Sequence, residues 1–97
     1  MTVFRSRLRA GVGTEYQPVA DRMLALATAM PGFVDFKAFV ADDGERVSII
    51  VFADADAHAA WRDHPEHREA QRLGRVQFYE TFDISVSRCV HRRRFPA

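Results

Sequence analysis

A tryptophan and two histidines lie close together in the chain and are the side chains best suited to chemistry. Trp61, His64 and His67 fall within the stretch WRDHPEHREAQRLGRVQFYETF, residues 61–82. A free imidazole has a pKa of about 6.5, so His67 can accept a proton from a phenol or a hydroquinone near neutral pH. A spacing of three, a proline between the two histidines and the lack of an evident third ligand argue against a metal site. His67 is therefore a general base, a group that hydrogen-bonds the substrate, or an inward-facing histidine without a chemical role.

Proline divides this stretch into two helices. Pro65 lacks an N–H and disfavours the helical conformation for His64, so one helix is predicted to end near Asp63 or His64 and the next to begin at Pro65. Successive side chains of a helix are rotated by about 100°, which gives the second helix one mainly apolar face. That face holds His67, Ala70, Leu73, Gly74 and Phe78, with Gln71 at its edge. His67 is thus predicted to point inward, whereas His64 fits either a helix cap or a site residue.

Alternating apolar and polar residues predict four strands, over 2–10, 33–41, 46–53 and 82–91. Asp43-Gly44 suits a tight turn between the second and third of them. A first helix is predicted from about Thr14 or Glu15 to Met30. Thr14 and Gln17 can form a capping box there, although Pro18 in the first turn leaves the starting register open. Asp54 or Asp56 can cap a short helix that reaches Trp61. The order strand, helix, strand, strand, helix, strand predicts an α+β, ferredoxin-like fold with an antiparallel sheet.

Two helices can cover only one face of such a sheet and leave the other bare. Residues 47–53 are apolar at every position except Ser48, which is typical of a strand covered on both sides. We therefore expect a homodimer that hides the bare face. Charged side chains should lie on or near that face, and Asp35 can pair there with a basic neighbour. They are Arg5, Arg7, Asp35 and Lys37.

The composition predicts one globular domain over residues 1–97. Hydrophobic residues make up 47% and charged residues 28%, and the net charge of +1 gives no reason to expect nucleic acid as a partner. The single Cys89 cannot form an internal disulfide, which favours a reducing, cytoplasmic location. No apolar run approaches the roughly 18 residues of a membrane span. The basic end of the chain, about 92–97, is expected to be a solvated tail.

The chain resembles the antibiotic biosynthesis monooxygenase (ABM) family, whose members are dimeric α+β barrels. The resemblance spans almost the whole sequence and is most specific in AMPGFVDFKAF (29–39), AAWRDHPEHREAQ (59–71) and GRVQFY (74–79). It implies a cavity between helices and sheet, with Trp61 in its wall. Polyketide-oxidising members have an Asn where Ala57 stands and an aromatic hydroxyl where His67 stands. Haem-degrading members have an Asn at Ser6 and an iron-binding His at Gln71, so haem degradation is disfavoured.

Two functional hypotheses follow from the resemblance and the residues. In the first, the chain is a cofactor-independent monooxygenase for a small phenol or hydroquinone, with His67 and Trp61 as catalytic residues and no metal or cofactor. In the second, it is a non-catalytic dimer that binds a small metabolite or serves as a stress-associated module. The side chains expected to contact the substrate are Ser6, Phe36, Phe52, His64, Gln71, Phe78 and Tyr79.

Overall fold

The computed structural model describes residues 1–96. Residue 97, the last of the basic tail expected over 92–97, lies outside the described residues. Along the chain the elements are β1 (Thr2–Leu8), α1 (Gly13–Ala29), β2 (Phe33–Val40), β3 (Arg46–Phe52), α2 (Ala55–Arg62), α3 (Pro65–Leu73), the π-helical turn η1 (Gly74–Phe78) and β4 (Tyr79–Val86).

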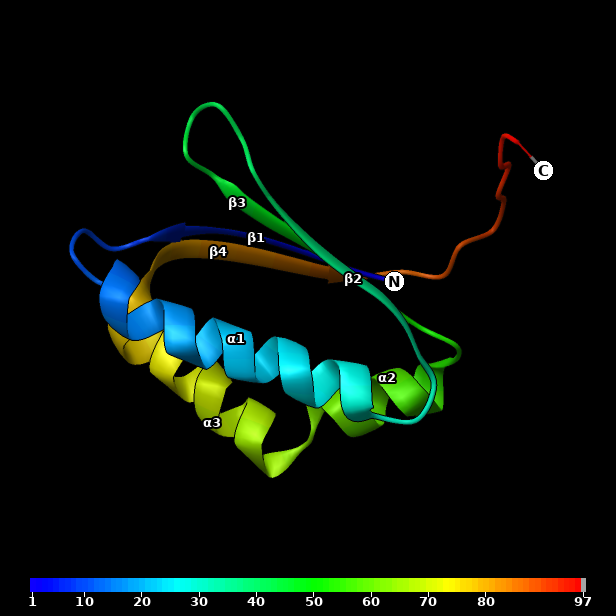
Figure 1. The fold of residues 1–97 in the computed structure, drawn as a ribbon, viewed down its shortest axis with the longest axis horizontal. Helices are drawn as coiled ribbons and strands as arrows, with labels where there is room; N and C mark the ends of the chain where they lie inside the picture. Colours follow the sequence, from blue (N-terminus) through cyan, green and yellow to red (C-terminus); the bar gives the residue numbers. More distant parts are fainter. Residues whose placement is uncertain (97) are drawn as a thin grey trace.

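The four strands form one antiparallel sheet in the order β2-β3-β1-β4. All three α-helices lie on one side of it, and the other face of the sheet has no helix over it (Figure 1). This is the ferredoxin-like arrangement, so the predicted α+β fold is confirmed. Within residues 1–96 no helix is long and apolar enough to cross a membrane.

Period-two alternation decides which side chains of the central strands face the helices. Ile50 on β3 is 3% exposed and belongs to the core beneath the helices. Ile49 therefore points to the uncovered face, where the register places it between Lys37 and Val3. Charged pairs border this face at the β2–β3 turn. They are Arg5 with Glu45 and Arg7 with Asp43, each with N–O distances of 2.7 Å.

The start of α1 differs from the prediction. The helix begins at Gly13 with Val12 as its N-cap, and no side chain caps it. Thr14 therefore lies inside the first turn, and the predicted capping box with Gln17 is wrong. The Gln17 amide instead donates to Asp21, one turn further on, at 2.8 Å.

The helix boundaries around Trp61 follow the local chemistry of the sequence. Asp54 caps α2 by accepting a hydrogen bond from the backbone N–H of Ala57 at 2.8 Å. Pro65 is the first residue of α3, as predicted. The α-helical part then ends at Leu73, and the chain continues as the π-helical turn to Phe78. Gly74 is needed at this junction, because an added Cβ would lie 2.5 Å from the Tyr79 ring.

The last strand was predicted too late and too long. It runs over 79–86 rather than 82–91, and it pairs only with β1. Thr2 opposes Val86, and beyond this pair Met1 and Ser87 exchange two backbone hydrogen bonds of 2.8 Å. Residues 87–96 form no regular element and extend away from the sheet (Figure 1). Alternation alone therefore does not make a strand where no neighbouring strand is present.

Replacing Gly32 by alanine should destabilise the protein more than replacing Gly44. Both glycines have positive φ, +82° and +89°, which costs an L-residue about 1–2 kcal/mol. A Cβ on Gly32 would also lie 2.6 Å from the Ala57 Cβ, whereas a Cβ on Gly44 meets nothing within 4 Å. We expect Gly32→Ala to lose about 1–3 kcal/mol more than Gly44→Ala in urea unfolding. If the two variants lost the same free energy of unfolding, α2 would be able to move away from an added Cβ at no cost.

Candidate active site

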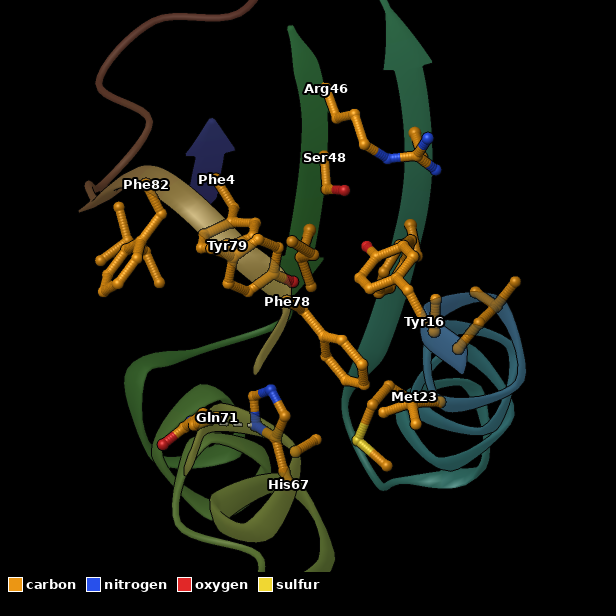
Figure 2. Close-up of a pocket in the computed structure, with 18 of the residues that line it drawn as sticks. Phe4, Tyr16, Met23, Arg46, Ser48, His67, Gln71, Phe78, Tyr79 and Phe82 are labelled. Atoms are coloured by element: carbon orange, nitrogen blue, oxygen red, sulfur yellow. Dashed lines mark hydrogen bonds between the residues drawn. The ribbon is translucent and has the colours of Figure 1, made fainter. Parts of the chain in front are cut away.

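A cavity of about 380 Å³ lies between the helices and the sheet. Its volume is in the range of small-molecule sites, which is roughly 300–1,000 Å³. Rings and aliphatic side chains form most of its wall, with a few polar groups among them (Figure 2). Lining residues from the sheet include Thr2, Phe4, Phe36, Arg46, Ser48, Ile50, Tyr79 and Phe82. Those from the helical segments include Tyr16, Gln17, Asp21, Met23, Trp61, His67, Gln71, Arg75 and Phe78.

Most of the side chains expected at the site do line this cavity. They are Phe36, Trp61, His67, Gln71, Phe78 and Tyr79. Ser6, Phe52 and His64 are not part of the lining.

Each of these three has a structural position that keeps it from the cavity. Ser6 is 2% exposed and lies in register between Arg46 and Phe82, whose longer side chains reach the cavity while its short hydroxyl does not. The Phe52 ring belongs to the core cluster and packs beside Trp61. His64 caps α3, because its Nδ1 accepts a hydrogen bond from the backbone N–H of Glu66 at 3.1 Å.

His67 and Trp61 form a stacked pair in the cavity wall. The ring centroids are 3.9 Å apart and the planes differ by 22°. The Nδ1 atom of His67 lies 3.0 Å from the backbone carbonyl oxygen of Trp61. The side-chain amide of Gln71 lies 3.4 Å from the same nitrogen and donates to the carbonyl oxygen of Arg62 at 3.2 Å. The stack and the hydrogen bond together hold the imidazole in one orientation.

These contacts determine the protonation state of His67. A carbonyl oxygen only accepts hydrogen bonds, so Nδ1 carries the proton and Nε2 keeps its lone pair. Burial lowers the pKa of His67 from its ordinary value of 6.5, and the hydrogen bonds to the backbone of α2 only partly oppose this shift. The ring is therefore neutral at pH 7. In Figure 2 its second nitrogen is directed toward the strands, which form the opposite wall of the cavity.

Two further groups define what the cavity can bind. The indole nitrogen of Trp61 is buried and has no hydrogen-bond partner among residues 1–96. An unpaired buried donor costs about 1–3 kcal/mol, so this N–H is left with an unmet need for an acceptor. Burial also raises the pKa of Tyr79, so its hydroxyl stays protonated and serves as a hydrogen-bonding group rather than a base.

Two polar groups on β3 were not among the predicted site residues. Arg46 and Ser48 line the cavity, and the guanidinium carbon of Arg46 lies 5.3 Å from the centroid of the Tyr16 ring. The signal was present, because both share the alternation of Ile50 and so face the helices. The apolar residues that follow Arg46 drew attention to a buried strand and away from this alternation.

No metal centre is apparent in the described part of the chain. Residues 1–96 contain no group of three His, Cys, Asp or Glu side chains arranged to hold an ion. The chemistry that this site offers from its own residues is proton transfer and hydrogen bonding within an apolar enclosure.

Stability should fall as the pH drops below about 6.5. Burial lowers the pKa of both His58 and His67, so the unfolded chain binds more protons than the folded one between the lowered values and 6.5. Each histidine can contribute up to about 1.4 kcal/mol per pH unit in that window. Urea unfolding between pH 7.5 and 5.5 should show this loss, and His67→Gln should make it shallower. His91→Gln, in the exposed tail, is the control; an unchanged slope in His67→Gln would contradict the assignment.

The fold and the cavity together place this chain among ferredoxin-like α+β proteins that hold a small-molecule pocket between sheet and helices. Residues 1–73 match the antibiotic biosynthesis monooxygenase family. An uncharacterized protein of Bacillus subtilis (strain 168), YqjZ, is 31% identical over 93 residues, which are 96% of this chain and 82% of that protein. The chain belongs to the antibiotic biosynthesis monooxygenase family.

Solved structures show the same fold at lower sequence identity. A structure of SnoaB, a cofactor-independent oxygenase from Streptomyces nogalater, has a TM-score of 0.81 with 22% identity and covers 99% of this chain and 95% of its own. Rv0793 from Mycobacterium tuberculosis has a TM-score of 0.84 with 15% identity, and 96% of each chain is covered. At these identities the likeness concerns the fold.

Proposed function

We propose that this protein is a cofactor-independent monooxygenase that oxidises a small phenol or hydroquinone in the cavity beside Trp61. The observation that carries the proposal is the neutral His67 ring, held by its Nδ1–H with its second nitrogen free to accept a proton. Family membership and the named activity of SnoaB support oxygenase chemistry. The aromatic wall of the cavity suits a flat, apolar substrate.

The reaction needs one proton acceptor and dioxygen. His67 Nε2 takes the phenolic proton, and the ring carbon of the resulting phenolate gives an electron pair to dioxygen, which forms a C–O bond. The peroxide takes the proton back from His67. The O–O bond then breaks as water leaves with the hydrogen of that ring carbon, and a second carbonyl forms. A phenol and one O₂ thus become a quinone and one H₂O.

The residues around the base supply positioning and exclusion of water. Trp61 presents its unpaired N–H, which can bind a substrate oxygen or the developing oxyanion. Phe36 lies edge-on to the indole with ring centroids 6.5 Å apart, and it helps to keep water from the reacting carbon. Gln71, Phe78 and Tyr79 are proposed as further substrate contacts.

Oxygen uptake by the purified protein with dihydroxynaphthalenes tests the proposal. We expect consumption of O₂ above the buffer rate, with quinone formed in equal amount and no added cofactor. A rise in melting temperature with the same compounds but no O₂ uptake would instead identify a non-catalytic binding protein. Such a result would overturn the proposed activity while leaving the cavity as a ligand site.

We also infer that the chain forms a homodimer through the uncovered sheet face. Val3, Val47, Ile49 and Val51 lie there by alternation, and Phe39 is 47% exposed. A second copy of the same face would remove this apolar surface from water, at about 25 cal/mol per Å² buried. A cytoplasmic location belongs to the same proposal and is supported by the unpaired, exposed Cys89.

A further inference from the structure

Arg46 and Arg75 differ from the other arginines of the described helices and strands in having no anionic or carbonyl partner. Within the described residues, side chains of the following arginines donate to a carboxylate or a backbone oxygen: Arg5, Arg7, Arg9, Arg22, Arg62, Arg68 and Arg72. Arg46 and Arg75 have no such partner among residues 1–96, and both line the cavity. Among the arginines of the described helices and strands, the two without such a partner therefore both lie at the cavity.

Of the two, Arg46 is the one held in place. It is half-buried on the central strand β3, and its guanidinium stands over the Tyr16 ring in a cation–π contact at 5.3 Å. Arg75 is exposed on the π-helical turn. Ser48, two residues along β3 from Arg46, adds a hydroxyl on the same side of the strand. A guanidinium beside a hydroxyl is suited to a planar carboxylate.

Two groups of polar side chains lie at opposite ends of the cavity, with aromatic rings between them. The other polar pair in the lining, Gln17 and Asp21 of α1, is exposed, and the Gln17 amide donates to the Asp21 carboxylate at 2.8 Å. Figure 2 shows Arg46 and Ser48 at the strand end, His67 and Gln71 at the helix end, and the rings of Phe78 and Tyr79 between them. A ligand that satisfies both ends must carry a hydroxyl group at one end of an aromatic ring system and an anionic group at the other.

We propose that Arg46, assisted by Ser48, forms a carboxylate subsite, and that the substrate is a fused-ring hydroxyaromatic acid. The carboxylate binds the guanidinium at the strand end, and the hydroxyl group at the far end of the rings reaches His67. This inference rests on the proposed function for the role of His67, whereas the carboxylate subsite itself concerns binding alone.

Two ligands that share one ring system, one with a carboxylate and one without this charge, test the subsite: 6-hydroxy-2-naphthoic acid and its methyl ester. Binding is measured by isothermal titration calorimetry under nitrogen, so that no turnover contributes. The wild-type protein should bind the acid at least 10-fold more tightly than the ester, as expected for a hydrogen-bonded charged group. Arg46→Gln should abolish that preference while leaving the affinity for the ester unchanged, which also shows that the cavity is intact. Arg46→Lys should restore it in part.

Arg75→Gln is the matched control, since it removes the same charge from the same cavity. It should keep the preference for the acid. The proposal is overturned if the wild-type protein does not prefer the acid, if the preference survives Arg46→Gln, or if both variants reduce it equally, which would indicate a general field effect. Absence of O₂ uptake with normal acid binding would overturn the oxygenase proposal and leave the subsite standing.

Discussion

His67→Gln should lower kcat/KM for oxidation of a hydroquinone by about 10²- to 10⁴-fold, which is the usual contribution of a positioned general base. Glutamine preserves polarity and much of the side-chain volume but cannot take a proton near neutral pH. Affinity for a non-oxidisable naphthalene ligand should change little, because the imidazole forms only one part of the cavity wall. Stopped-flow or oxygen-electrode kinetics, together with calorimetric titration, separate the two effects.

His64→Gln is the matched control for this substitution. His64 caps α3 and does not line the cavity, so its loss should cost about 0.5–2 kcal/mol of stability without changing kcat/KM. The pH profile gives a second readout. Because burial lowers the pKa of His67, the active neutral form persists below pH 6.5, and kcat/KM should decline only at lower pH. Equal turnover by wild type and His67→Gln would exclude His67 as the base.

Ile49→Arg should convert the protein from a dimer to a monomer. The side chain points to the uncovered sheet face, in register with Lys37 on β2, so an arginine there would place two adjacent positive charges in the proposed interface. Size-exclusion chromatography with light scattering at micromolar concentration should show the mass of two chains for wild type and of one chain for the variant.

Val76→Arg serves as the comparison for this experiment. Val76 is 56% exposed on η1, on the helix side of the sheet, so the same chemical change there should leave the dimer intact. The uncovered face would be excluded as the interface by either of two results. The wild-type protein could prove monomeric, or the Ile49→Arg variant could keep the mass of the dimer.

Local chemistry made much of the fold predictable. The Asp54 cap and the break before Pro65 depend on residues within a few positions of each other, and both appear where the sequence placed them. The end of β4 depends instead on its pairing with β1, in which Thr2 opposes Val86. The sequence around Val90 contains no information about that distant strand, so the strand was predicted too long.

In the candidate site, too, features set by nearby residues were predictable, whereas features set by distant elements were not. The inward direction of His67 followed from helical spacing, but its stack on Trp61 depends on how two helices meet. Ser6 was placed correctly on the helix-facing side of β1, yet it lies beneath the cavity wall because longer neighbours extend past it. Arg46 was missed because a polar residue at the start of an apolar strand looks like an exposed end until the facing helix is known.

The turn between α2 and α3, residues 63–64, affects how the site can change during evolution. On an unbroken α-helix, side chains six positions apart are rotated by about 600°, so an indole and an imidazole at that spacing would point to different sides. Here the turn at 63–64 folds the chain back and brings the two rings face to face. An insertion or deletion in this turn would shift the imidazole while every strand kept its register. A change of length at residues 63–64 is therefore a direct way for related proteins to alter the site while they keep the same fold.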